Sequence, residues 1–181
     1  MTRLTGKLVR LRELTSADQP QLRELVNDPE VMRASSIYAP VSDVQQESWF
    51  RSAMQNPHAR WFGIEDARGE PALVGTCCLV DIEWIGRTAE LRVRLDRSAW
   101  GGGLGTDACE LLLAFGFDDL NLERIGLRVW GRNTRAQRVY EKLGFVLEGR
   151  LRGAGFINGQ RDDIVLMGLL REEWRAQKPS Q

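Results

Sequence analysis

The chain has 181 residues, of which 43% are hydrophobic, so it is long and apolar enough to build one folded domain around a buried core. Lysine plus arginine number 25 and aspartate plus glutamate number 25, and this balance argues against broad electrostatic binding of nucleic acids or membrane surfaces. The absence of a long apolar run, a signal-peptide pattern and a disulfide framework among the three cysteines indicates the reducing cytoplasm.

The first part of the chain predicts a strand, two helices and a β-hairpin, in that order. Residues 8–12 alternate as a strand, and a helix capped at residues 15–16 is stopped at residues 28–29 by Asp-Pro. Ser42 with Gln45 three positions later forms a capping box that begins the second helix. The hairpin and the next strand are expected at residues 61–65, 73–80 and 89–95.

A glycine-rich segment joins the strand 89–95 to a helix that begins near Leu104. Four of the five positions 101–105 are glycine, which permits positive φ and close approach of the backbone to a ligand. A helix N-terminus adds free N–H groups and the positive end of a dipole, so this junction predicts a cradle for a diphosphate. It is neither a P-loop nor a convincing dinucleotide fingerprint. The alternative is a flexible loop that only caps the helix.

The elements after this loop complete the chain. The helix has an apolar face of Leu104, Ala108, Leu111, Leu112 and Phe115. A strand at 125–129 leads to Asn133, a good N-cap for a short helix that Gly144 closes in the left-handed conformation. One face of this helix carries Ala136, Val139, Tyr140 and Leu143. Strands are expected at 145–151 and 164–170 around a glycine-rich turn at 153–159, followed by a disordered tail at 178–181.

The glycine loop followed by an Asn-capped helix that ends in Tyr-Glu-Lys-Leu-Gly-Phe resembles the GNAT superfamily of acetyl-CoA-dependent N-acetyltransferases. Within it, the chain resembles the branch of ribosomal-protein N-terminal acetyltransferases and spermidine acetyltransferases, from about residue 8 to residue 174. The order of elements predicts an α/β (α+β) fold. We expect a single domain over residues 1–181, with a mixed, mostly antiparallel sheet of six to seven strands and helices on both faces.

The resemblance implies which residues hold acetyl-CoA. The strands ending at Leu95 and Trp130 would splay apart, and their main chains would hold the pantetheine arm. The candidate cofactor-binding residues are Val93, Leu95, Trp100, Gly101, Gly102, Gly103, Leu104, Gly105, Thr106, Asn133, Ala136 and Tyr140. The family often has a basic residue where Gly102 stands, which puts a side-chain contact to phosphate in doubt there. Asn133 either contacts the pantetheine or only caps its helix.

Three residues are catalytic candidates. In the family a tyrosine at the place of Tyr140 protonates the departing thiolate, whereas the alternative is a core tyrosine on an apolar helix face. Glu90 or Glu83 could accept the proton of the incoming ammonium. Glu90 shares a face of its strand with Arg92 and could instead pair with it, and Glu83 could be a solvated residue. The resemblance makes the Leu95 N–H the oxyanion donor.

The acceptor is an amine whose identity the sequence leaves open. We expect a protein or peptide N-terminal amine, with a polyamine or another small amine as the alternative. Residues 155–160 with Asp162 and Asp163 resemble a segment of polyamine acetyltransferases, although these carboxylates could simply be solvated in a turn. An alternative outside the enzymes is a sensor that binds acyl-CoA without catalysis. The presence of both Asn133 and Tyr140 argues against it. A homodimer is expected by analogy, and no metal site is expected with one histidine.

Overall fold

The computed structural model of the chain describes residues 3–35, 39–157 and 159–177, which divide into two compact units. The first unit contains the chain up to Val80 together with Arg92–Leu112, and the second contains Asp81–Leu91 together with the chain from Leu113 onward. The predicted tail at 178–181 lies outside the described residues. No helix in the described part of the chain is long and apolar enough to cross a membrane.

The first unit contains five strands and most of the helices. They are β1 (Arg3–Thr5), β2 (Val9–Arg12), α1 (Gln19–Asn27), α2 (Pro29–Ala34), α3 (Asp43–Gln55), β3 (Arg60–Asp66), β4 (Ala72–Glu83), β5 (Thr88–Leu95) and α4 (Leu104–Ala114), of which β4, β5 and α4 continue into the second unit. Hydrogen bonds join the strands in the order β1-β2-β3-β4-β5, and β1 to β4 are antiparallel. The strands predicted at 8–12, 61–65, 73–80 and 89–95 are therefore confirmed as β2 to β5, whereas β1 was not predicted.

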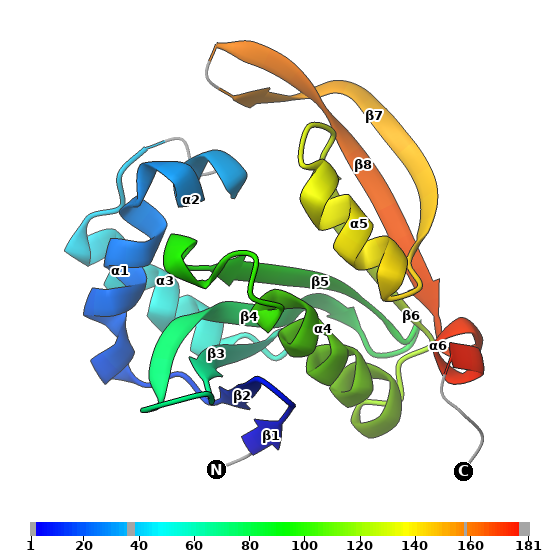
Figure 1. Cartoon of the computed structure of the whole chain (residues 1–181), viewed down its shortest axis with the longest axis horizontal. Helices are drawn as coiled ribbons and strands as arrows, with labels where there is room; N and C mark the ends of the chain where they lie inside the picture. The colour runs from blue at the N-terminus through cyan, green and yellow to red at the C-terminus, as the bar shows by residue number, and fades with distance from the viewer. Residues whose placement is uncertain (1–2, 36–38, 158, 178–181) are drawn as a thin grey trace. The chain divides into compact units, whose positions relative to one another are not determined.

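Helices cover both faces of the strands in this unit. On one face, Trp61 of β3 packs with Trp49 of α3 at a ring separation of 5.1 Å, within a cluster that includes Leu22 of α1. The neighbouring residues Phe62 and Ile64 are buried on the opposite face, because successive side chains of a strand alternate. Figure 1 shows α3 and α4 on opposite sides of β3 and β4. The expectation of helices on both faces is confirmed here.

A buried carboxylate ties α4 to the β1–β2 hairpin. Asp107 is 7% exposed, and its Oδ2 accepts from the backbone N–H of Leu8 over 2.6 Å and of Val9 over 2.9 Å. Its Oδ1 accepts from the N–H of Lys7 over 3.2 Å. A side chain at Gly6 would collide with this carboxylate, so the hairpin approaches the helix through a glycine. Three N–H groups without partners in the strand ladder are thereby satisfied by one charge.

The Asp28-Pro29 step begins a helix as well as ending one. We expected it only to stop α1, but the Asp28 carboxylate accepts from the N–H groups of Glu30 and Val31 and caps α2, which starts at Pro29. Proline suits the first helical position because its missing N–H would have no intrahelical partner there. The capping box of Ser42 and Gln45 at the start of α3 is confirmed.

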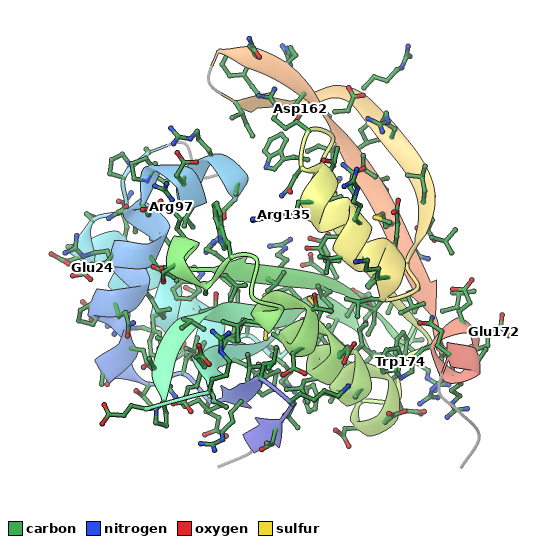
Figure 2. The ribbon with its side chains drawn as sticks, in the orientation of Figure 1. Glu24, Arg97, Arg135, Asp162, Glu172 and Trp174 are labelled. Carbon is green, nitrogen blue, oxygen red and sulfur yellow. The ribbon has the colours of Figure 1, made fainter. Side chains whose placement is uncertain are left out.

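The second unit continues the strand order as β5-β6-β8-β7. Its elements are the first half of β5, a π-helical turn at Phe115–Asp119, β6 (Arg124–Trp130), α5 (Thr134–Lys142), β7 (Val146–Ile157), β8 (Gln160–Leu170) and α6 (Arg171–Gln177). Strand β6 is parallel to β5 and antiparallel to β8, and β7 is antiparallel to β8. Figure 1 shows α5 along the β7–β8 hairpin, and Figure 2 shows Trp174 on α6, where its ring lies 6.0 Å from that of Phe117.

Three expectations about these elements need correction. The sheet order contains eight strands, because the short β1 joins the seven that alternation predicted. The hairpin arms extend through most of the predicted turn at 153–159, since Gly155 lets β7 pass directly over the Trp130 ring. The buried face of α4 includes Cys109 and Leu113, because the helix is covered over a wider arc than one stripe, whereas the predicted Leu111 and Phe115 are only half-buried and Phe115 lies in the turn after α4.

Replacing the anchoring carboxylate tests its contribution to the fold. We expect Asp107→Ala to lower the free energy of unfolding by about 3 kcal/mol, because three backbone N–H groups lose a charged acceptor. Glu110→Ala, at an exposed position one turn later on the same helix, should change it by less than about 0.5 kcal/mol. Urea unfolding measures both, and equal effects of the two variants would contradict the anchoring role.

Candidate functional site

The glycine loop of the first unit forms an open main-chain cradle. A short 3₁₀ turn at Arg97–Ala99 follows β5, and α4 begins at Leu104. Gly101 and Gly103 have φ values of +83° and +82°, which favour glycine, and residues 101–103 are exposed. The free N–H groups of the α4 N-terminus lie at this loop, with no side chain from residues 101–103 to cover them. This arrangement suits an anionic ligand such as a diphosphate.

Contacts with β5 hold the loop in place. The indole Nε1 of Trp100 donates to the carbonyl of Leu95 over 3.1 Å. A Cβ built on Gly105 would lie 3.0 Å from Cδ1 of Leu95, so the start of α4 sits directly on that side chain. Thr106 is half-buried in the first turn of α4. The structure therefore brings Trp100 and Gly105, two of the candidate cofactor residues of this unit, against Leu95.

An arginine from another segment stands beside the loop. Arg68 follows β3, and its Nη1 lies 3.4 Å from the position that a Cβ on Gly102 would take. Its Nε and Nη2 donate to the carboxylate of Asp66 over 2.9 and 2.7 Å, which orients the guanidinium and leaves Nη1 toward Gly102. The Arg68 hydrogen bonds lower the pKa of Asp66 to about 2, so the pair stays ionised at neutral pH. The sequence did not single out Arg68, because the local sequence of a charged residue in a hairpin turn does not indicate which distant segment its side chain approaches.

The second unit contains the Asn-capped helix. The Oδ1 of Asn133 accepts from the N–H of Ala136 over 3.1 Å, and Gly144 ends the helix with φ of +91°, so both predicted ends of α5 are confirmed. Tyr140 is 9% exposed, and its ring packs edge-on against Phe145 with centroids 5.8 Å apart. The Asn133 side chain is thus engaged as a cap, and Tyr140 is a buried side chain on the inner face of the helix.

The second unit also has an open groove of about 290 Å³ on its sheet. Its charged lining residues are Asp81, Glu90, Arg124, Arg128 and Glu148. Arg124 binds Glu148 through two hydrogen bonds, which lower the pKa of Glu148. The parallel ladder of β5 and β6 pairs Thr88–Glu90 with Arg124–Gly126, and each strand continues beyond it. Glu90 is half-buried and lies in this groove, as its role as a candidate base requires.

Other candidate carboxylates lie elsewhere or are already bound. Glu83 is exposed at the end of β4 and is not among the groove residues. Asp162, which Figure 2 labels on the β7–β8 hairpin, accepts from Nε of Arg132 over 2.9 Å. Asp163 accepts from the N–H of Gly153 over 2.8 Å and from Arg150. The two aspartates therefore hold the hairpin and its neighbouring loop rather than standing free in solvent.

The cysteines are unsuited to nucleophilic chemistry. Cys77, Cys78 and Cys109 are free thiols that are 1% exposed or less. Burial raises the pKa of Cys109 to about 12 and that of Cys77 well above its usual value, so neither forms a thiolate at neutral pH. Within the described residues, no three side chains of histidine, cysteine, aspartate or glutamate gather as a metal site.

Comparison with known proteins identifies relatives over nearly the whole chain. Residues 9–146 match the family model of the acetyltransferase (GNAT) domain. Spermidine N(1)-acetyltransferase of Escherichia coli K12 is 32% identical over 169 residues, which cover 93% of this chain and 89% of that protein. A Bacillus subtilis protein provisionally named a ribosomal N-acetyltransferase is 31% identical over 107 residues, or 59% of this chain and 58% of its own.

Solved structures of similar proteins agree with these relatives. The crystal structure of spermidine N-acetyltransferase from Vibrio cholerae, in complex with CoA and spermine, matches with a TM-score of 0.86. The match covers 94% of this chain and 99% of that chain at 28% sequence identity. The resemblance inferred from the glycine loop and the Asn-capped helix is therefore confirmed, together with the fold class that it implied.

Neighbouring glycines of the loop allow a matched test of its backbone geometry. Gly101→Ala should lower the free energy of unfolding by about 1–2 kcal/mol, because an alanine at φ of +83° is strained although no atom lies near its Cβ. Gly102→Ala has no positive φ and a Cβ contact of 3.4 Å, so it should change stability by less than about 0.5 kcal/mol. Chemical denaturation measures both, and a loop that tolerates Gly101→Ala equally well would refute this geometry.

Proposed function

Because the chain belongs to the GNAT acetyltransferase family and uses acetyl-CoA as acetyl donor, we propose that it acetylates the N-terminal amine of a protein or peptide. The charge of the groove in the second unit carries this proposal. Its three carboxylates face two guanidiniums, which leaves a net charge of minus one. Glu148 is bound by Arg124, and the carboxylates of Asp81 and Glu90 also line the groove. A net charge of minus one suits a single ammonium better than a chain of several.

The groove residues also suit the proton transfers of the reaction. An amine attacks a thioester only in its neutral form, and an α-amine, with a pKa of about 7.7–8.0, is partly neutral at physiological pH. We propose that Glu90 accepts the proton of the acceptor ammonium, directly or through water, because Glu90 is half-buried in the groove. We assign to Tyr140 the return of a proton to the departing thiolate. Glu83, exposed and outside the groove, is the weaker candidate for the base.

A polyamine acceptor is the second candidate, and the Escherichia coli and Vibrio cholerae relatives support it. A polyamine carries several cationic amines and would need several free carboxylates. The groove supplies few, and Arg128 adds a positive charge to it. Asp162 and Asp163 are engaged by Arg132, Arg150 and the Gly153 N–H. This distribution of charge favours the N-terminal amine.

We further propose that Arg68 supplies the phosphate-binding cation that Gly102 lacks. When bound, acetyl-CoA brings a diphosphate, for which Gly101–Gly105 and the Thr106 hydroxyl offer donors. A backbone cradle leaves most of the diphosphate charge without a counterion. Arg68 is held by Asp66 with its Nη1 toward Gly102, so its charge is positioned before the ligand arrives. Asn133, Ala136 and the main chains of Val93 and Leu95 remain our candidates for the pantetheine arm.

Three features of the whole protein remain proposals. We infer that residues 8–174 work as one acetyltransferase domain, since the family model runs through segments of both units. The buried free thiols support a cytoplasmic location. A homodimer is supported by the exposed apolar side chains of the edge strand β7, namely Val146, Leu147, Leu151 and Phe156.

An acceptor panel tests the proposed function. With acetyl-CoA saturating, we expect kcat/KM for short peptides with free N-termini to exceed that for spermidine by about tenfold or more. Tyr140→Phe keeps the ring that packs on Phe145 and should lower kcat by about 100-fold without weakening binding of CoA. Faster turnover of spermidine would select the polyamine candidate. CoA binding without turnover of any amine would indicate a sensor rather than an enzyme.

A charge-rescue experiment tests the cofactor proposal. Arg68→Gln should raise KM for acetyl-CoA by about tenfold and leave kcat nearly unchanged, because the lost charge contributes equally before and during the reaction. Adding Gly102→Lys should restore much of the loss, since Gly102 has no positive φ and the added side chain starts beside Arg68. Binding of dephospho-CoA, which lacks the 3′-phosphate, distinguishes the two phosphate groups. If Arg68→Gln weakens binding of dephospho-CoA as much as that of CoA, Arg68 contacts the diphosphate. An unchanged KM in Arg68→Gln would refute the role.

A further inference from the structure

Among the described residues of the first unit, one partly buried cation has no carboxylate partner. The Nε of Arg94, on β5, donates to Oγ of Ser35 at the end of α2 over 3.1 Å. Across residues 3–35, 39–157 and 159–177 this is its only hydrogen bond, and no carboxylate lies within ion-pair distance of it. A guanidinium has five N–H donors, so four of them have no acceptor in the described part of the protein.

The environment of Arg94 disfavours an unpaired positive charge. Burial lowers the pKa of Arg94, the neighbouring Cys78 raises it and the nearby guanidinium of Arg92 lowers it, whereas no carboxylate contributes. If Arg94 served only to hold the end of α2, a neutral donor could bond the Ser35 hydroxyl without this desolvation cost. The other arginine near this end of the sheet, Arg12, is instead bound by the carboxylates of both Asp18 and Glu65. Arg94 is therefore positioned to bind the anionic group of a ligand.

The direction of Arg94 indicates which ligand supplies that anion. Leu95, the next residue, packs under Gly105 of the glycine loop, so its side chain faces the cofactor cradle. Successive side chains alternate along a strand, and Arg94 therefore projects from the face of β5 opposite the cradle. A nucleophile must approach the thioester from the side that the cofactor does not occupy. The anion that reaches Arg94 thus belongs to the acceptor amine and not to the acetyl donor.

We propose that Arg94 and Ser35 form an acceptor subsite for a carboxylate, so that the preferred substrate is an amine that also carries a carboxylate. This inference rests on the proposed acetyltransferase function and narrows its substrate class. The planar fork of a guanidinium matches the two oxygens of a carboxylate. The Ser35 hydroxyl fixes Nε and leaves both terminal nitrogens for the ligand. Peptides with an acidic residue near the N-terminus and free amino acids share this chemistry, whereas polyamines lack it.

Matched acceptors test the subsite. The first pair consists of two peptides that differ only in having Asp or Asn at the second position. The second pair consists of a free amino acid and its amide. The two pairs therefore also distinguish a side-chain carboxylate of a peptide from the carboxylate of a free amino acid. For the wild-type protein we expect kcat/KM about tenfold higher for the carboxylate member of at least one pair, mainly through a lower KM. Equal rates within both pairs, or turnover of spermidine alone, would overturn the subsite while leaving the acetyltransferase function intact.

Variants separate recognition from folding. Arg94→Gln should abolish the preference by raising KM about tenfold for the carboxylate acceptor only, and Arg94→Lys should retain part of it. Ser35→Ala should weaken the preference without removing it, since only the contact that orients Nε is lost. Arg51→Gln, at an exposed surface ion pair, is the control and should leave all four rates unchanged.

The outcomes remain distinguishable from a failure of the proposed function. A loss of activity in Arg94→Gln that is equal for both members of each pair would show a structural role and refute the subsite. The unfolding midpoint and the KM for acetyl-CoA identify a variant that fails to fold, and Arg94→Lys, which keeps the charge, then decides the question. If the wild-type protein acetylates no amine at all, the proposed function itself fails.

Discussion

The Asp107 carboxylate and the three N–H groups that it accepts are the constraint on which the cofactor cradle depends. A helix N-terminus can bind an anion only if its position relative to the preceding strand is fixed. On one side Asp107 ties the first turn of α4 to the β1–β2 hairpin, and on the other Gly105 rests on Leu95 of β5. The charge is buried because it replaces strand hydrogen bonds that the hairpin could not otherwise make.

In the first unit, the two faces of β5 carry residues of the two anion sites that we propose. The Leu95 face supports the glycine loop, and Arg68 beside that loop provides a charge that the loop lacks. The opposite face carries Arg94, whose donors have no carboxylate partner in the described residues. The two arginines differ in their surroundings: Asp66 holds Arg68 in place, whereas Arg94 is half-buried and has no carboxylate partner among the described residues. Each arrangement would favour binding of an anion. Arg68 is already oriented toward the loop, and an anion bound to Arg94 would offset the cost of its partial burial.

The groove of the second unit has a net negative charge of its own. Glu148 is neutralised by Arg124, and Gly168 makes room for that pair because any side chain there would overlap it. Asp81, Glu90 and Arg128 also line the groove, so its five charged residues sum to a net charge of minus one. The relatives named for spermidine share this fold, and the fold alone does not determine the acceptor.

Sequence by itself determined the family, seven of the eight strands, the ends of α3 and α5, and the glycine cradle. These features are readable because capping, alternation and turn chemistry act between residues a few positions apart. Only the tertiary structure shows which distant residues the charged side chains contact. Asp107 and Lys7 are one hundred positions apart, and nothing in their local sequence links them. Three further contacts also depend on how distant segments meet in space: Arg68 beside Gly102, Arg94 on Ser35, and Asp162 with Arg132.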